Sequence, residues 1–118
     1  NLKNNYAEVK LWNYATEKME PTGLQFCGLI MGDHSKCGIN TMFNTGTVVG
    51  VSANIFGAGF PPKWIPSFAW GGSDKQIYQI EKALETAERV FQRRNVPFTE
   101  TEKDILRYLH HELIQQNN

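Results

Sequence analysis

The sequence predicts a mainly β chain, in which short parallel strands stack as a single-stranded β-helix of the hexapeptide-repeat type and an α-helical hairpin follows. Three observations predict this fold. An apolar residue recurs at every sixth position between residues 29 and 60, a small residue tends to stand two positions earlier, and two amphipathic patterns end the chain. The β-helix coils are expected over 1–60, an aromatic and proline-containing linker over 61–72, and the helical hairpin over 73–118.

The sixfold repeat carries the prediction. Side chains two apart in a strand point to the same face, so each unit supplies two inward positions. Gly or Asn follows four of the five large apolar residues and is expected to bend the chain into the next strand. Residues six apart share no helical face, and a meander needs longer strands. The predicted inward positions are Met31, Cys37, Phe43, Val49 and Ile55, together with Leu29, Ser35, Thr41, Thr47 and Ala53.

The chain before the repeat is expected to hold one strand and one inserted loop. Residues 1–8 are polar and rich in asparagine, and residues 9–12 alternate as a short strand does. Turn residues near 13–23 predict a loop that bulges from the coil, and the apolar run 24–31 predicts a buried strand. After Ile55 the repeat ends, because the prolines that follow offer no donor to a strand ladder.

Two helices are predicted after the linker. The aromatic residues of the linker are expected to pack on the open end of the coil or on a neighbouring subunit, with a ligand wall as the alternative. Ser73 with Gln76, and Thr99 with Glu102, form capping-box patterns. The helical hairpin is expected to cover the last rung or to brace a trimer. Its apolar stripes are Ile77, Ile80, Leu84, Ala87 and Phe91, then Ile105, Leu109 and Leu113.

Composition and charge exclude several classes of protein. The 118 residues are 41% apolar and 20% charged, as in an ordinary globular domain. Twelve basic and twelve acidic residues give a formal net charge of zero, so no long-range field would draw the chain to nucleic acid or to a membrane surface. No apolar run reaches the ~20 residues of a membrane span. We expect neither kind of partner, and the two cysteines are consistent with a cytoplasmic protein.

The spacing of cysteine and histidine predicts no metal site. Cys27 and Cys37 stand ten residues apart, which is neither a zinc nor a thioredoxin spacing. Cys37 occupies an inward position of the repeat and is expected to be a buried, reduced thiol. His110 and His111 are adjacent rather than four apart on a helix, and we expect them to be solvated or at an interface.

Two polar stretches supply the candidate functional residues. His34, beside Asp33 and Lys36, is the candidate catalytic residue, although a general base needs a partner and a cleft, and an outward histidine is commonly a surface residue. Asn40 offers an amide for binding, or accepts the backbone angles of a bend. The amides, phenol and ammonium of Asn5, Tyr6 and Lys10 suit a sugar or a phosphate, and the alternative is a polar loop. With Lys36, these residues are the candidates for binding a substrate or acyl-CoA.

Residues 2–6 with Val9-Lys10, and residues 32–40, resemble the C-terminal domain of sugar-1-phosphate nucleotidyltransferases. The nearest likeness is to the Bacteroidetes-type putative enzymes. These are related to the bifunctional N-acetylglucosamine-1-phosphate uridylyltransferase/glucosamine-1-phosphate acetyltransferase. Gly46, residues 66–68 and residues 70–72 extend the resemblance over most of the chain. The resemblance implies a left-handed β-helix, a homotrimer and acyl-CoA clefts between adjacent coils.

The resemblance also implies roles for single residues. Asn5-Tyr6 resembles the Asn-Tyr pair that lines the acetyl-transfer site of the bifunctional enzymes. Lys10 roughly resembles their sugar-contacting lysine, one residue closer to the asparagine. Their catalytic histidine lies upstream of the pair and their nucleotidyltransferase domain precedes it, so neither is in this chain. We therefore expect a C-terminal part of a longer transferase, inactive by itself.

These observations give a leading function and two alternatives. The leading function is the C-terminal domain of a sugar-1-phosphate nucleotidyltransferase in nucleotide-sugar biosynthesis, with an acetyltransferase-like architecture. Sugar phosphates and acyl-CoA are its expected small-molecule partners, and acetyl-CoA is the co-substrate if the parent protein acylates. The first alternative is a non-catalytic trimerisation or regulatory module. The second, a carbonic-anhydrase-like zinc enzyme, needs three histidines where the repeat holds only His34.

Overall fold

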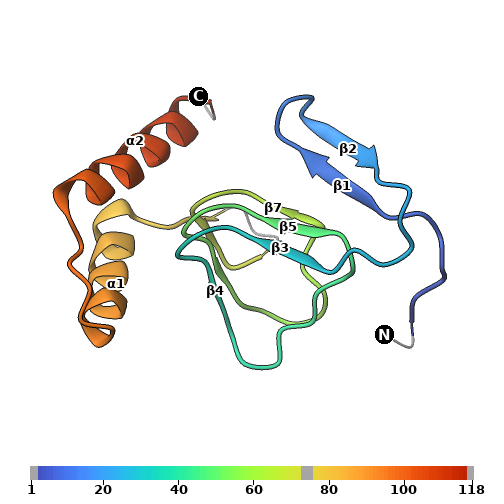
Figure 1. Ribbon diagram of the computed structural model, residues 1–118, viewed down its shortest axis with the longest axis horizontal. Coiled ribbons are helices and arrows are strands. Elements are labelled where there is room, and N and C mark those ends of the chain that lie inside the picture. Colours follow the sequence, from blue (N-terminus) through green and yellow to red (C-terminus); the bar gives the residue numbers. More distant parts are fainter. Residues whose placement is uncertain (1–2, 73–75, 117–118) are drawn as a thin grey trace.

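The computed structural model describes residues 3–72 and 76–116, which form short strands and two helices (Figure 1). The helices are α1 (Ile80–Arg93) and α2 (Glu100–Gln116). The strands are β1 (Lys10–Asn13), β2 (Lys18–Pro21), β3 (Leu29–Met31), β4 (Lys36–Cys37), β5 (Thr47–Val49), β6 (Asn54–Ile55), β7 (Trp64–Ile65), β8 (Ala69–Trp70) and β9 (Gln76–Ile77).

The strands form three separate small sheets. β1 and β2 make an antiparallel hairpin, and β3, β5 and β7 make a parallel sheet in that order. The third sheet has the order β4-β6-β8-β9, in which β9 runs antiparallel to β8. In the parallel sheet Leu29 pairs with Thr47, eighteen residues on, whereas Val48 pairs with Trp64, sixteen residues on. The offset between paired residues is therefore a multiple of six from β3 to β5, but not from β5 to β7.

The prediction of a mainly β, left-handed β-helix is wrong. The chain is a small α/β structure, because the helices of 14 and 17 residues hold more of the described chain than all of its two- to four-residue strands. The sheets are mixed, with antiparallel pairs at β1–β2 and β8–β9, and the parallel strands do not continue as a solenoid. Residues 38–46, where further rungs were expected, contain no strand.

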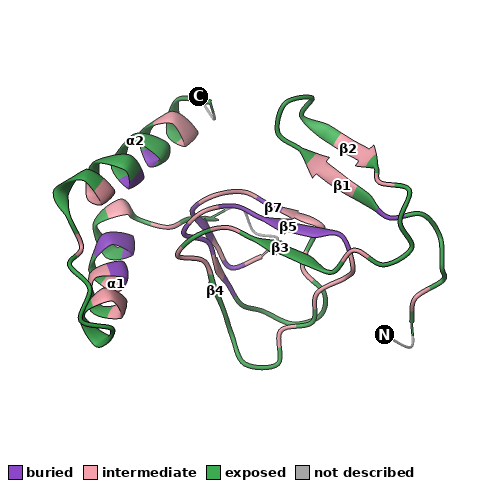
Figure 2. Ribbon diagram, in the orientation of Figure 1, coloured by how far each residue is buried: buried purple, intermediate pink, exposed green. Residues whose placement is uncertain are grey.

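The burial of the repeat residues explains why the sixfold repeat predicted the wrong fold. The predicted inward residues Val49 and Ile55 are 2% and 1% exposed, but Leu29 and Met31 are 39% and 37% exposed, and Cys37 is also exposed. Figure 2 shows the same contrast between buried β5 and exposed β3 beside it. Only the second half of the repeat encloses a core, and Cys37 is an exposed thiol rather than a buried one. The run 24–31 is likewise exposed for the most part.

The bends also fall elsewhere than expected. Gly32 and Gly50 do not have left-handed backbone angles, and they are needed for a different reason. A Cβ on Gly32 would overlap the carbonyl oxygen of Gly50, and a Cβ on Gly50 would lie 2.5 Å from the backbone nitrogen of Ser67. Glycine at these positions lets successive layers approach. Between residues 28 and 52, left-handed residues recur every six positions, at Gly28, His34, Asn40, Gly46 and Ser52.

Two hydrophobic clusters of the described residues hold the two larger sheets and the helices together. One joins the strands and contains Val49, Ala53, Ile55, Ile65 and Ala69. The other joins the helices to the sheets around Phe68, whose side chain is 0% exposed and whose φ is 59°. Against Phe68 pack the buried residues Ala83, Leu84 and Leu106 of α1 and α2. Both helices consequently lie to one side of the sheets in Figure 1.

The helix starts differ from the predicted ones. Gln76 and Ile77 belong to β9, which covers the edge of β8, and α1 begins at Ile80 after the N-cap residue Gln79. Ser73 of the first capping box lies outside the described residues. In the second, the Thr99 hydroxyl accepts the backbone N–H of Glu102 at 3.3 Å. Neither described helix is both long enough and apolar enough to cross a membrane.

Two segments expected as irregular contain strands. The predicted loop near 13–23 carries β2 and the turn of the β1–β2 hairpin, and the predicted linker 61–72 carries β7 and β8. The linker is therefore part of both larger sheets. Trp12 of the hairpin stacks on Trp64 of β7, which attaches the hairpin to the parallel sheet.

Candidate functional site

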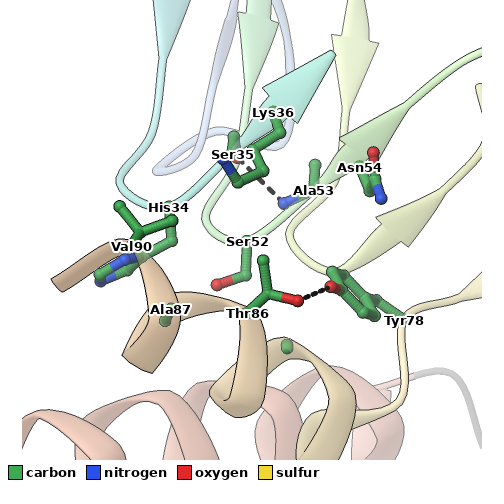
Figure 3. Close-up of a pocket in the computed structure, with 11 residues that line it drawn as sticks. His34, Ser35, Lys36, Ser52, Ala53, Asn54, Tyr78, Thr86, Ala87 and Val90 are labelled. Carbon is green, nitrogen blue, oxygen red and sulfur yellow. Dashed lines mark hydrogen bonds between the residues drawn. The ribbon is translucent and has the colours of Figure 1, made fainter. Parts of the chain in front are cut away.

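Two cavities contain candidate binding residues that the sequence singled out. The first, the Lys36 pocket, lies between the sheets and α1 and has a volume of about 190 Å³ (Figure 3). Lys36 and Asn54 are direct partners in the pairing of β4 with β6, so their side chains leave the same face of the sheet. Its other lining residues are His34, Ser35, Ser52, Ala53, Tyr78, Ala83, Thr86, Ala87 and Val90.

Hydrogen bonds fix the walls of the Lys36 pocket. The Ser35 hydroxyl donates to the carbonyl of Gly50 at 2.6 Å and accepts the N–H of Ala53 at 2.9 Å. On the helix side, the hydroxyls of Tyr78 and Thr86 are 3.0 Å apart, as drawn in Figure 3. The pocket thus combines an ammonium and an amide on the strand side with a mainly apolar helix face.

His34 lies at a left-handed bend between β3 and β4, with φ of 65°. Its ring lies 5.7 Å from the ring of Phe91 and 6.3 Å from that of Phe98. In the described part of the chain, no residue forms a hydrogen bond with the imidazole. A general base needs a partner that orients it. These contacts instead suit a side chain that docks the helices on the sheets.

The second cavity, the Asn5 cleft, is polar and has a volume of about 280 Å³. None of the described residues that line it carries a carboxylate, and two carry an ammonium group. No ion pair joins Lys63 to a carboxylate within residues 3–72 and 76–116. A cleft with this charge favours an anion. Its lining residues are Lys3, Asn4, Asn5, Asn44, Thr45 and Lys63.

The hydroxyl of Thr45 is the best-defined donor of the Asn5 cleft. Its oxygen accepts the backbone N–H of Cys27 at 2.9 Å and that of Gly28 at 3.0 Å. A hydroxyl has two lone pairs and one hydrogen, so both acceptor positions are occupied and the hydrogen is left to donate. Similarly, Asn5 accepts the N–H of Ala7 with its side-chain oxygen at 3.0 Å, which leaves its NH₂ group as a donor.

The structure brings together some predicted residues and separates others. His34 and Lys36 share the Lys36 pocket, and Asn5 lines the Asn5 cleft. Tyr6, Lys10 and Asn40 line neither of the two cavities. Tyr6 packs edge-on against Phe26, with 5.8 Å between the ring centroids. Lys10 is an exposed residue at the start of β1. Asn40 is an exposed residue at a bend, with φ of 63°.

Sequence reasoning missed Thr45 and Lys63, although a signal for Thr45 was present. Thr45 follows Cys27 by eighteen residues, and Lys63 follows Thr45 by eighteen. The same offset joins Leu29 to Thr47 in the parallel sheet. Three six-residue units therefore predict that Thr45 lies in the layer next to Cys27. They do not predict the place of Lys63, because the register from β5 to β7 changes to sixteen residues and pairs Val48 with Trp64.

The remaining cysteines and histidines form no evident site. Cys27 and Cys37 are both free thiols. Among the described residues, no three His, Cys, Asp or Glu side chains are placed to hold a metal ion. His110 is 8% exposed and its Nε2 lies 3.0 Å from the carbonyl oxygen of Tyr78. It is a core residue, contrary to the expectation of a solvated or interface histidine, whereas His111 is exposed.

Comparisons with protein-family models, with curated proteins and with solved structures found no match to this chain.

Proposed function

We propose that this chain is the C-terminal domain of a sugar-1-phosphate nucleotidyltransferase of nucleotide-sugar biosynthesis, and that its Asn5 cleft binds the phosphate group of a sugar phosphate. The observation that carries the proposal is the obligatory donor of Thr45 beside the ammonium of Lys63 and the amide of Asn5. The resemblance of residues 2–10 to sugar-handling transferases supports the same ligand class.

The chemistry of the cleft suits this ligand. Hydrogen bonds from ammonium and hydroxyl donors to a phosphate oxygen are charge-assisted and contribute more than neutral ones. Amides both donate and accept, so Asn44 provides partners for sugar hydroxyls. The Asn4 oxygen accepts the N–H of Tyr6 and its NH₂ group donates to the carbonyl of Gln25, which leaves one N–H of Asn4 as a donor. The cleft offers donors without a paired nucleophile and base, so the chain holds a substrate or product and leaves the nucleotidyl transfer to another part of the parent protein.

Calorimetric titration with glucose 1-phosphate, glucose and inorganic phosphate tests the proposal. Lys63→Met keeps the aliphatic stem and removes the charge, and should weaken glucose 1-phosphate binding by about tenfold to a hundredfold, the worth of one hydrogen bond to a charged group. Lys10→Met is the matched control, since Lys10 is a lysine that does not line the cleft. Equal effects of both substitutions, or binding of glucose as tight as glucose 1-phosphate, would contradict the assignment.

Acetyl-CoA is the proposed second ligand, at the Lys36 pocket. The apolar face of α1 suits an acyl group, and Lys36 with Asn54 suits the carbonyl or a nearby anion. Small-molecule sites usually span about 300–1,000 Å³, so this smaller cavity would enclose only the acyl end. Titration with acetyl-CoA and with free coenzyme A distinguishes the possibilities: preference for the acetylated form supports this ligand, and equal binding or none removes it.

A non-catalytic assembly module is the alternative, and a specific observation favours it. β3 is an outer strand of its sheet, and the residues around it expose large apolar side chains. Edge strands of this kind pair with other chains unless something covers them. We propose the homotrimer as the assembled form, and the cytoplasm as its location in view of the two free thiols. The exposed residues are Leu24, Phe26, Leu29, Ile30 and Met31.

Sedimentation equilibrium decides whether this apolar surface assembles the protein. The wild-type chain should sediment at three times the monomer mass, and Ile30→Lys should shift it to the monomer. Exposed Ile114, on α2, supplies the control substitution Ile114→Lys. A wild-type monomer, or a trimer that Ile30→Lys leaves intact, would remove this alternative.

A further inference from the structure

A third cavity, the α2 groove, lies where α1 and α2 meet the bends of the sheets and has a volume of about 430 Å³. Its apolar wall comes from Val51, Phe91, Ile105 and Leu109, and its polar groups include Asp33 and Glu102. His34, at the bend that also borders the Lys36 pocket, completes the side opposite α2. None of the functions proposed above uses this groove.

The charge of the α2 groove is opposite to that of the Asn5 cleft. Two carboxylates line it, and none of its described lining residues is a lysine or arginine. The basic residues on the same helix are engaged elsewhere: Lys103 pairs with Glu88 and Glu100, and Arg107 pairs with Glu100 and Asp104. The groove therefore presents uncompensated negative charge beside apolar surface.

Glu102 gives a second, independent indication of a ligand. Its backbone N–H bonds to the Thr99 hydroxyl, but its carboxylate oxygen Oε2 is buried without a hydrogen-bond partner. A buried polar atom without a partner costs free energy, and a charged one costs more than a neutral one. An ammonium group bound in the groove beside Glu102 would stabilise this carboxylate by charge attraction, which does not require contact with the covered oxygen.

The apolar wall limits the size and shape of the ligand. Ile105 and Leu109 are 54% and 36% exposed, so much of the wall is accessible from solvent. The volume falls within the range of small-molecule sites. The ring of Phe91 adds an aromatic surface, which attracts organic cations as well as apolar groups.

We propose that the α2 groove binds an organic cation, a primary amine joined to a compact alkyl or aryl body. The amine lies toward Asp33 and Glu102, and the body lies against Ile105, Leu109 and Phe91. This ligand has the opposite charge to the one proposed for the Asn5 cleft, so the two sites can be tested separately.

Two probes of matched skeleton and opposite charge, 4-phenylbutylamine and 4-phenylbutyrate, test the proposal by calorimetric titration of the full chain. The amine should bind at least tenfold more tightly than the carboxylate. Glu102→Gln keeps the shape of the side chain and removes its charge, and should weaken amine binding at least tenfold. Glu100→Gln is the control, because Glu100 lies in the same helical turn but its side chain is 75% exposed.

Three outcomes would overturn the proposal: no binding of the amine at about 10 mM, equal binding of both probes, or equal effects of Glu102→Gln and Glu100→Gln. Circular dichroism of each variant shows whether it is folded. If Glu102→Gln fails to fold, Asp33→Asn provides the same test from the other side of the groove, with the same expected tenfold loss. None of these results bears on glucose 1-phosphate binding at the Asn5 cleft.

Discussion

The indole rings of Trp12 and Trp64 lie stacked, with 3.9 Å between their centroids and 9° between their planes. The stack joins the β1–β2 hairpin to β7. Both indole Nε1 atoms are buried without a hydrogen-bond partner, so the packing of the rings has to offset that cost. The stack is therefore one aromatic contact that attaches the hairpin to the parallel sheet.

Replacement of Trp12 by alanine should release the hairpin. We expect Trp12→Ala to lower the free energy of unfolding by about 2–3 kcal/mol, because it removes a large, partly buried ring and the stacking of that ring on Trp64. Chemical denaturation measures the loss, and the exciton couplet of the stacked indoles should disappear from the circular dichroism spectrum. Tyr14→Ala, at a 58% exposed side chain of the same hairpin, should cost less than about 0.5 kcal/mol. Equal losses would show that the stack is not the attachment.

Replacement of Gly50 by alanine tests the close approach of the layers. The added Cβ would lie 2.5 Å from the backbone nitrogen and side-chain oxygen of Ser67, so the layers must separate. We expect a loss of about 1–3 kcal/mol on chemical denaturation. Gly38→Ala is the control, since its nearest contact is at 3.8 Å and alanine stiffens the unfolded chain, which makes it neutral or stabilising by up to about 1 kcal/mol. A Gly50→Ala variant with unchanged stability would mean that the layers containing Gly50 and Ser67 are further apart than described.

Replacement of Thr45 by valine removes the hydrogen-bonding oxygen of the side chain while keeping its size. Valine cannot accept the N–H groups of Cys27 and Gly28, so we expect a loss of about 1–3 kcal/mol in the free energy of unfolding. Thr45→Ser retains the oxygen and should remain within about 1 kcal/mol of the wild type. Thermal and urea denaturation of the two variants provide the comparison. If Thr45→Ser is as destabilising as Thr45→Val, the stability contributed by Thr45 comes from its methyl group and not from the hydrogen bonds that its oxygen accepts.

Replacement of His110 by phenylalanine tests the hydrogen bond that joins α2 to Tyr78, the residue after β9. A carbonyl oxygen only accepts, so Nε2 of His110 donates to Tyr78 across 3.0 Å. His110→Phe keeps the edge-on contact with Phe68 but leaves that carbonyl without its donor, and should cost about 0.5–1.5 kcal/mol. His111→Phe, at the exposed neighbour, should stay within about 0.5 kcal/mol. Hydrogen exchange at α2 should report the same order, and the reverse order would contradict the assignment.

The predictable part of the fold was local. Amphipathic spacing gave both helices, and the sixfold spacing gave the offset that pairs Leu29 with Thr47. The repeat could not reveal which residues are covered, because Val49 and Met31 occupy equivalent positions and only Val49 is buried. Nor could it reveal that Trp64, after two prolines, rejoins the parallel sheet. Burial depends on what lies on the other side of a strand, and no local pattern contains that information.

The candidate sites were predictable only in part. His34 and Lys36 were found because they stand close together in the sequence, and the structure places them in one pocket. Lys63 contributes to the Asn5 cleft from a segment that looked like a linker. The sequence indicated only a capping role for Glu102. The capping pattern explains the hydrogen bond of its backbone N–H, but it does not predict the unpartnered carboxylate oxygen.

A crystal structure of the protein grown with glucose 1-phosphate tests the central claim most directly. The phosphate should lie in the Asn5 cleft, within hydrogen-bond distance of the Thr45 hydroxyl and the Lys63 ammonium, with the sugar toward the asparagine amides. A phosphate bound beside Lys10 or Lys36, or an Asn5 cleft left without sugar phosphate at saturating concentration, would contradict the account.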